Sequence, residues 1–103
     1  SFVVQEIFRI NQYKEKDFRL SFFRTKNNAE IDLILSKGKK VILIEIKSTE
    51  KIDEIEVRKL ARLAHAFGPQ TEAYYLSRSK DSLVIEKIQC LHWKAFLSKV
   101  EFL

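Results

Sequence analysis

The fold is decided by residues 30–47, which read EIDLILSKGKKVILIEIK. Two apolar-rich runs in this stretch, Glu30–Leu35 and Lys40–Lys47, predict two β-strands. The intervening Ser36-Lys37-Gly38-Lys39 predicts a tight turn, so we expect the two strands to form an antiparallel hairpin. The unbroken Val41–Ile44 run is typical of a strand that is buried on both faces. We therefore expect the second strand of the hairpin to lie in the middle of a sheet.

On the N-terminal side, apolar residues at helical spacing predict an amphipathic helix over residues 1–14. Residues 17–25 alternate, which predicts a strand. Three of its apolar side chains are expected to share one face of the strand: Phe18, Leu20 and Phe22. Lys26-Asn27-Asn28 then predicts the turn that leads into the hairpin, because Asn tolerates a left-handed backbone.

On the C-terminal side, Asp53 and Glu56 have the spacing of a helix capping box. Gly68 and Pro69 predict the end of that helix. The side chains expected to face the core are Ile55, Leu60, Leu63, Ala64 and Phe67.

Two further strands are predicted over Glu72–Ser77 and Leu83–Ile88. A short last helix is predicted by the spacing of Trp93, Phe96, Leu97 and Val100. A right-handed crossover through the helix that begins near Asp53 would make strand 72–77 parallel to strand 40–47. These elements together predict an α/β fold in which a mixed central sheet is flanked by helices.

Composition narrows the class of protein. The chain has 103 residues, which predicts a single domain over 1–103, and its Gly and Pro contents are too low for a fibrous or disordered chain. One Cys cannot form an internal disulfide, so we expect a reducing, cytoplasmic location. No apolar run approaches the roughly 18 residues of a membrane-spanning helix, so no membrane association is expected. Met is absent, also at position 1, and we expect a fragment of a longer protein.

Charged residues at the ends of the two hairpin strands are unusual for a plain core. Glu45 and Lys47 are two residues apart, so their side chains leave the strand on the same face, and Glu30 and Asp32 repeat this spacing on the neighbouring strand. Hairpin pairing would bring Asp32 close to Glu45. Two converging carboxylates repel each other, and a divalent cation such as Mg²⁺ relieves that repulsion. The pattern therefore predicts a site for Mg²⁺ or Mn²⁺.

These residues carry a family resemblance. Asp32, twelve further residues and then Glu45-Ile46-Lys47 resemble the signature of the PD-(D/E)XK nucleases, and the predicted αβββαβ order is similar to their restriction-endonuclease-like core. Residues 22–26 and 29–32, followed by residues 44–48, are closely similar to a narrower group. That group is the C-terminal DUF4143-type domain of archaeal and bacterial AAA-type ATPases, and the resemblance covers roughly residues 1–78.

The resemblance implies a metal-dependent nuclease that hydrolyses DNA phosphodiester bonds. Asp32, Glu45 and Lys47 would be its catalytic residues. Asp32, Glu45 and the Ile46 carbonyl would bind the metal, and Glu6 of the first helix would reach it through water. Glu30 and Ser48 are accessory positions. Ile31 stands where the signature has Pro. The resemblance further implies an ATPase domain in the same full-length chain, and duplex-cutting enzymes of this fold often pair two sites, as in a homodimer.

The basic residues support an anionic partner. Lys and Arg outnumber Asp and Glu by 19 to 14, and DNA is the partner we expect. The candidate phosphate-binding residues come from the turns and from the helix after the motif: Arg24, Lys26, Lys37, Lys39, Lys40, Arg58, Lys59 and Arg62.

Two alternatives stay open at this point. In the first, the domain has lost catalysis and serves as a nucleic-acid- or protein-interaction module beside an ATPase. In the second, the charged residues form ordinary cross-strand pairs in a basic α/β domain without a metal site. The chain itself has neither a Walker loop nor a G-x-G-x-x-G motif, so phosphate loops of those two kinds are excluded.

Overall fold

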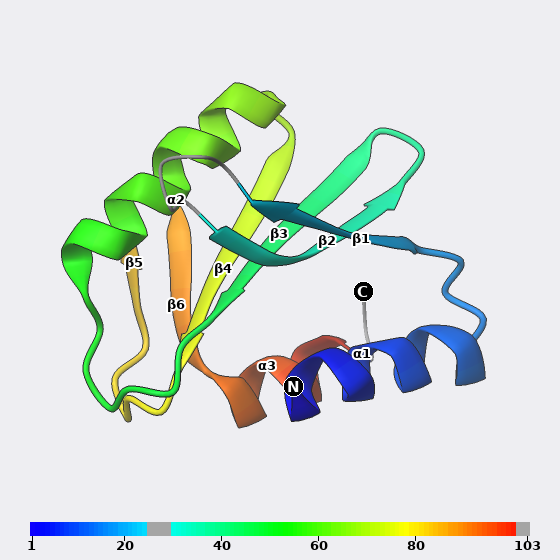
Figure 1. Ribbon diagram of the computed structural model, residues 1–103, viewed down its shortest axis with the longest axis horizontal. Coiled ribbons are helices and arrows are strands. Elements are labelled where there is room, and N and C mark those ends of the chain that lie inside the picture. The colour runs from blue at the N-terminus through cyan, green and yellow to red at the C-terminus, as the bar shows by residue number, and fades with distance from the viewer. Residues whose placement is uncertain (25–29, 101–103) are drawn as a thin grey trace.

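A computed structural model of the chain describes residues 1–24 and 30–100, and it shows a mixed α/β fold (Figure 1). The elements, in chain order, are α1 (Phe2–Tyr13), β1 (Arg19–Arg24), β2 (Glu30–Lys37), β3 (Lys40–Ile46), α2 (Glu54–Phe67), β4 (Thr71–Ser77), β5 (Leu83–Ile85), β6 (Ile88–His92) and α3 (Trp93–Val100). The six strands form one sheet in the order β1-β2-β3-β4-β6-β5. β4 is parallel to both of its neighbours, and the other pairs are antiparallel. The predicted fold class is confirmed.

The helices cover the two faces of the sheet unequally. α2 lies over one face, and α1 and α3 lie together against the other (Figure 1). Each face has its own apolar cluster, one centred on Ile42, Ile44 and Phe96 and the other on Leu43 and Leu60. β3 contributes to both clusters because its successive side chains point to opposite faces.

The β2–β3 hairpin forms as predicted. The two strands pair from Leu33 with Ile44 to Lys37 with Lys40, so Gly38 and Lys39 alone make the turn. Gly38 has a φ of +59°, which suits the first central residue of a two-residue hairpin turn. Residues 42–44 are completely buried, as expected of a central strand flanked by β2 and β4.

α2 begins and ends where the sequence predicts. The Asp53 side chain accepts hydrogen bonds from the backbone N–H groups of Ile55 and Glu56, and Gly68, with a φ of +123°, follows the last residue. The prediction that Ile55 faces the core is wrong, because this side chain is 68% exposed. The buried face contains Val57 and Leu60, and a residue two positions before Val57 lies about 200° around the helix from it.

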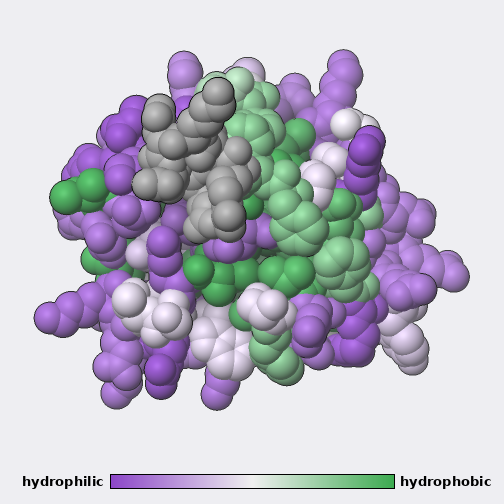
Figure 2. Space-filling model, in the orientation of Figure 1, coloured by the Kyte–Doolittle hydropathy of each residue, from purple (hydrophilic) through white to green (hydrophobic). Residues whose placement is uncertain are grey.

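The N-terminal strand also departs from the prediction at one residue. Phe18 and Leu20 pack against the core, but Phe22 is 64% exposed instead of sharing their burial. The register of β1 against β2 shifts between Ser21 and Phe23, so Phe22 has no paired residue on β2. Figure 2 shows apolar side chains at the surface in the region of β1. The predicted turn at 26–28 lies outside the described residues.

The single strand predicted over residues 83–88 is in fact two strands. β5 and β6 form a hairpin whose turn consists of Glu86 and Lys87, both with positive φ, at 48° and 70°. Such a turn normally carries Asn or Gly, so two long charged residues gave no turn signal. Among the helices that the structure describes, none is both long and apolar enough to cross a membrane.

Substitutions on the buried and the exposed face of α2 should have different effects on the free energy of unfolding. Leu60→Ala should lower the free energy of unfolding by about 2–5 kcal/mol, because Leu60 is 1% exposed. Ile55→Ala should change it by less than about 0.5 kcal/mol, because the side chain is solvated and Ala favours the helix. Urea denaturation of both variants is the measurement. Equal losses would show that α2 buries the face that contains Ile55.

Candidate functional site

The candidate site lies where β3 leaves the core. Glu45 follows the buried Ile44 and pairs with Tyr75 of the parallel strand β4. The Glu45 side chain remains almost completely buried, and the residue is 4% exposed. The Lys47 Nζ lies 3.4 Å from Glu45 Oε1, on the same face of the strand. The predicted proximity of the two side chains is therefore present.

Asp32 reaches the same place from β2. The backbone N–H of Ile46 donates a hydrogen bond of 2.7 Å to Asp32 Oδ2. In the hairpin register, Asp32 and Glu45 are the next residues outward from the last pair, Leu33 with Ile44. Asp32 is thus fixed at the end of β3 by a charge-assisted hydrogen bond, which is among the stronger kinds.

An irregularity in β2 places Asp32 at this point. Ser21 and Phe23, two positions apart on β1, pair with Ile34 and Ile31, three positions apart on β2, so β2 has one extra residue there. Leu33 packs in the cluster beneath α1 and α3, whereas Ile31 packs in the cluster beneath α2, although strict alternation would give them the same face. Irregularities of this kind re-aim side chains and are frequent beside active sites.

Nearby positive charge does not fully compensate the burial of the Glu45 carboxylate. Burial raises the pKa of Glu45 from its ordinary 4.5 to about 7, the charges of Glu56 and Asp32 add to the rise, and Lys47 opposes it. One partly exposed ammonium group therefore does not compensate the desolvation of this carboxylate. A cation of higher charge at the same place would do so.

Lys47 has the opposite balance. Burial alone would lower the pKa of its ammonium group, but attraction and hydrogen bonding to Glu45, with smaller contributions from Glu56 and Tyr75, raise that pKa above its ordinary value. Lys47 is therefore positively charged near neutral pH. Its backbone N–H donates a 2.8 Å hydrogen bond to the Leu76 carbonyl, which holds this residue against β4.

Two residues near the site were not in the predicted set. Tyr75 is 1% exposed, and its hydroxyl accepts a 3.4 Å hydrogen bond from the N–H of Asp53, so it links the sheet to the start of α2. Glu56, in the first turn of α2, is close enough to affect both Glu45 and Lys47. The pairing of β3 with β4 brings Tyr75 to the site. No local sequence pattern predicts this position.

Glu6 forms its ion pair within α1. Its carboxylate pairs with Arg9 at 2.9 Å, and it is not among the groups that shift the pKa of Glu45. Among the described residues, no group of three or more His, Cys, Asp or Glu side chains could hold a metal ion. The two predicted carboxylate ligands, Asp32 and Glu45, lie at the site, and the N–H of Ile46 faces Asp32. Ser48 is exposed just after β3. The Glu30 side chain lies outside the described residues.

The predicted phosphate-binding residues do not surround this site evenly. Lys37, Lys39 and Lys40 lie at the turn of the β2–β3 hairpin. Since β3 rises about 3.3 Å per residue, Lys40 is about 16 Å along the strand from Glu45. Lys37 donates a 2.7 Å hydrogen bond to the Lys16 carbonyl, and Lys39 is exposed. The Arg24 side chain and Lys26 lie outside the described residues.

The basic residues of α2 are partly neutralised. Arg58 pairs with Glu54 at 3.7 Å and with Glu86 at 3.5 Å. Lys59 pairs with Glu56 at 3.6 Å. Exposed pairs of this kind contribute less than about 1 kcal/mol each and open readily. Arg62 is exposed and faces a different part of the molecule, described below.

Comparison with known proteins gives one match. The family model "Domain of unknown function (DUF4143)" matches residues 1–96, which is nearly the whole chain. Neither the curated proteins nor the solved structures gave a match.

The burial of Glu45 predicts a specific dependence of stability on pH in metal-free buffer. Because the folded state raises the pKa of Glu45 from 4.5 to about 7, the wild type should lose stability as the pH rises through this window and stay level above it. Glu45→Gln removes the charge. It should be more stable than the wild type by about 1–3 kcal/mol at pH 8 and no more stable below pH 4.5.

Urea denaturation between pH 4 and pH 8, with EDTA present, tests this dependence. Glu72→Gln, an exposed carboxylate on β4, is the matched control and should leave the pH profile unchanged. A parallel profile for Glu45→Gln and the wild type would contradict the burial of an ionised Glu45.

Proposed function

The chain belongs to the DUF4143 family, and we propose that it is a metal-dependent nuclease-like domain of PD-(D/E)XK type that hydrolyses phosphodiester bonds of DNA. One observation carries the proposal. Asp32, Glu45 and Lys47 converge at the end of β3, where the Ile46 N–H holds Asp32 at 2.7 Å and Lys47 lies 3.4 Å from Glu45. The observed α1-β1-β2-β3-α2-β4 order, which agrees with the αβββαβ core, supports the same assignment.

The donor set fits Mg²⁺ or Mn²⁺. Asp32 and Glu45 supply carboxylate oxygens, and the Ile46 carbonyl supplies a third oxygen. Mg²⁺ is often held by only one or two carboxylates together with water and substrate phosphate, so a third acidic ligand is not required. When bound, such an ion polarises the phosphate and lowers the pKa of a coordinated water.

Lys47 would act as a cation. Its pKa is raised, so it keeps its proton and does not serve as the general base for an attacking water. A fixed ammonium group beside the metal ligands stabilises the negative charge that develops on the phosphate. Tyr75 and Asp53 would keep the start of α2 in place above this group, through the 3.4 Å hydrogen bond between them.

The net charge of +5 supports an anionic polymer as the substrate, because Lys and Arg bind phosphates without reading sequence. Lys39 and Lys40 would contact a duplex that extends from the site toward the hairpin turn, since both are exposed and about 16 Å is within a few base-pair steps. An adjoining AAA-type ATPase domain, a paired second copy and a cytoplasmic location belong to the same proposal.

A second candidate function rests on the ion pair itself. Lys47 already occupies the space next to Glu45, and the described residues offer no third acidic or His ligand. A domain that had lost catalysis could retain this pair and would serve as a nucleic-acid- or protein-interaction module of an ATPase.

DNA cleavage distinguishes the two functions. With Mg²⁺ or Mn²⁺, the wild type should cut at least one member of a panel of duplex, single-stranded and branched DNA. Asp32→Asn and Lys47→Gln should each lose about a hundredfold or more in rate, because each removes a group that acts on the reacting phosphate. Asp81→Asn and Lys80→Gln are matched controls, since both residues are exposed on the loop after β4.

Urea denaturation should show that all four variants are folded. Cleavage that persists in both Asp32→Asn and Lys47→Gln would contradict the nuclease proposal. Wild-type protein that binds DNA and cuts nothing on the panel would favour the interaction module.

A further inference from the structure

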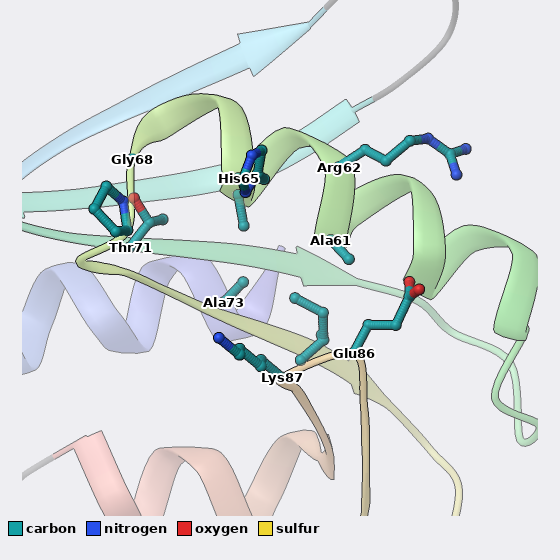
Figure 3. A pocket seen from close by; sticks show the side chains of 11 residues that line it. Ala61, Arg62, His65, Gly68, Thr71, Ala73, Glu86 and Lys87 are labelled. Carbon is teal, nitrogen blue, oxygen red and sulfur yellow. The ribbon is translucent and has the colours of Figure 1, made fainter.

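A groove of about 570 Å³ lies away from the candidate site (Figure 3). One of its walls is the second half of α2, and the other is the β5–β6 turn, with the start of β4 between them. Thr71, at one end of the groove, pairs with Val41 near the beginning of β3, whereas Glu45 lies near the opposite end of that strand. The groove therefore belongs to a separate part of the surface.

Small side chains create the groove. Ala61 and Ala64 on α2 face Ala73 on β4 and Ile88 on β6, so the helix and the sheet are separated by methyl groups at this point. The lining is predominantly apolar, and its volume is within the range of roughly 300–1,000 Å³ that is typical of ligand sites.

Positive side chains stand on both walls. Arg62 projects from α2, and Lys87 projects from the opposite wall (Figure 3). In the part of the chain that the structure describes, Arg62 and Lys87 make no ion pair. The acidic residue of the groove, Glu86, is 3.5 Å from Arg58, which offsets its charge.

The wall that carries Lys87 is conformationally strained. Glu86 and Lys87 hold φ angles of 48° and 70° without the Asn or Gly that normally relieves such a turn. A left-handed conformation costs a non-glycine residue roughly 1 kcal/mol. Strain of this kind is often retained where it places a side chain for binding, and here it places Lys87 at the edge of the groove.

We infer that this groove binds an extended, acidic peptide segment of a partner protein. An extended peptide points successive side chains to opposite sides, so its apolar residues can lie on the alanine floor while acidic residues reach the cations on the two walls. A nucleic acid fits less well. The lining contains no Phe, Tyr or Trp for base stacking, and the apolar floor offers nothing to phosphates.

The inference does not depend on the proposed nuclease activity, because none of Asp32, Glu45 and Lys47 lines the groove. The test uses a short fluorescein-labelled peptide in which Glu and Leu alternate, titrated with the wild-type chain by fluorescence anisotropy. Two further probes are the same peptide with Gln in place of Glu and a single-stranded DNA oligonucleotide of similar length.

Four variants locate the binding. Arg62→Gln and Lys87→Gln should each raise the Kd for the acidic peptide about threefold to fivefold, the range expected when one exposed charge pair is lost. Ala61→Leu narrows the groove without changing its charge and should weaken binding of the acidic peptide. Lys80→Gln removes an exposed charge elsewhere and should leave the Kd unchanged. Urea denaturation verifies that each variant is folded.

Three results would overturn the inference. The first is no binding of the acidic peptide, or equal binding of the Gln peptide. The second is binding that Ala61→Leu and Lys87→Gln leave intact, which would place the peptide elsewhere. The third is DNA binding, in preference to the peptide, with the same dependence on Arg62 and Lys87, which would make the groove a nucleic-acid contact. Loss of metal binding or cleavage in Asp32→Asn, by contrast, leaves the inference untouched.

Discussion

Glu45 carries a carboxylate at the end of a strand that is buried on both faces, and the cost of that burial governs the local structure. Residues 42–44 pack against apolar side chains on both faces of the sheet. A charged residue can therefore follow only where the strand leaves the core. Lys47 compensates part of the charge from two residues away, and Asp32 is drawn in by the Ile46 N–H. The result is two carboxylates and one ammonium group with an excess of negative charge in a poorly solvated place. A divalent cation would complete this arrangement.

Much of the fold follows from local patterns. The Val41–Ile44 run, the turn at Gly38 and the cap at Asp53 each use a short stretch of chain, and the structure confirms all three. The convergence of Asp32 and Glu45 was also predictable, because a tight hairpin fixes the register between its strands. One error occurred where local signals are silent. The Glu86–Lys87 turn lacks Asn and Gly, and only tertiary packing can impose positive φ on such residues.

Other features required the assembled sheet. The extra residue in β2 beside Asp32 is visible only when β1 and β2 are paired, and it exposes Phe22 against the expected alternation. Tyr75 reaches the site because β4 pairs in parallel with β3, although the whole of α2 lies between these two strands in the sequence. Which charged residues of α2 are neutralised also depends on the tertiary structure. Arg58 is neutralised by acidic neighbours, whereas Arg62 faces a groove.

The proposed function requires that Asp32 and Glu45 together bind a divalent cation. Calorimetric titration of Mn²⁺ into the wild type and into Asp32→Asn tests it without any assumption about substrate. We expect one site in the wild type that is lost in the variant, since a single carboxylate with Lys47 beside it does not retain the ion. Equal Mn²⁺ binding by the two proteins would contradict the claim. So would the absence of heat from both, even in the presence of a phosphodiester oligonucleotide that completes the ligand shell.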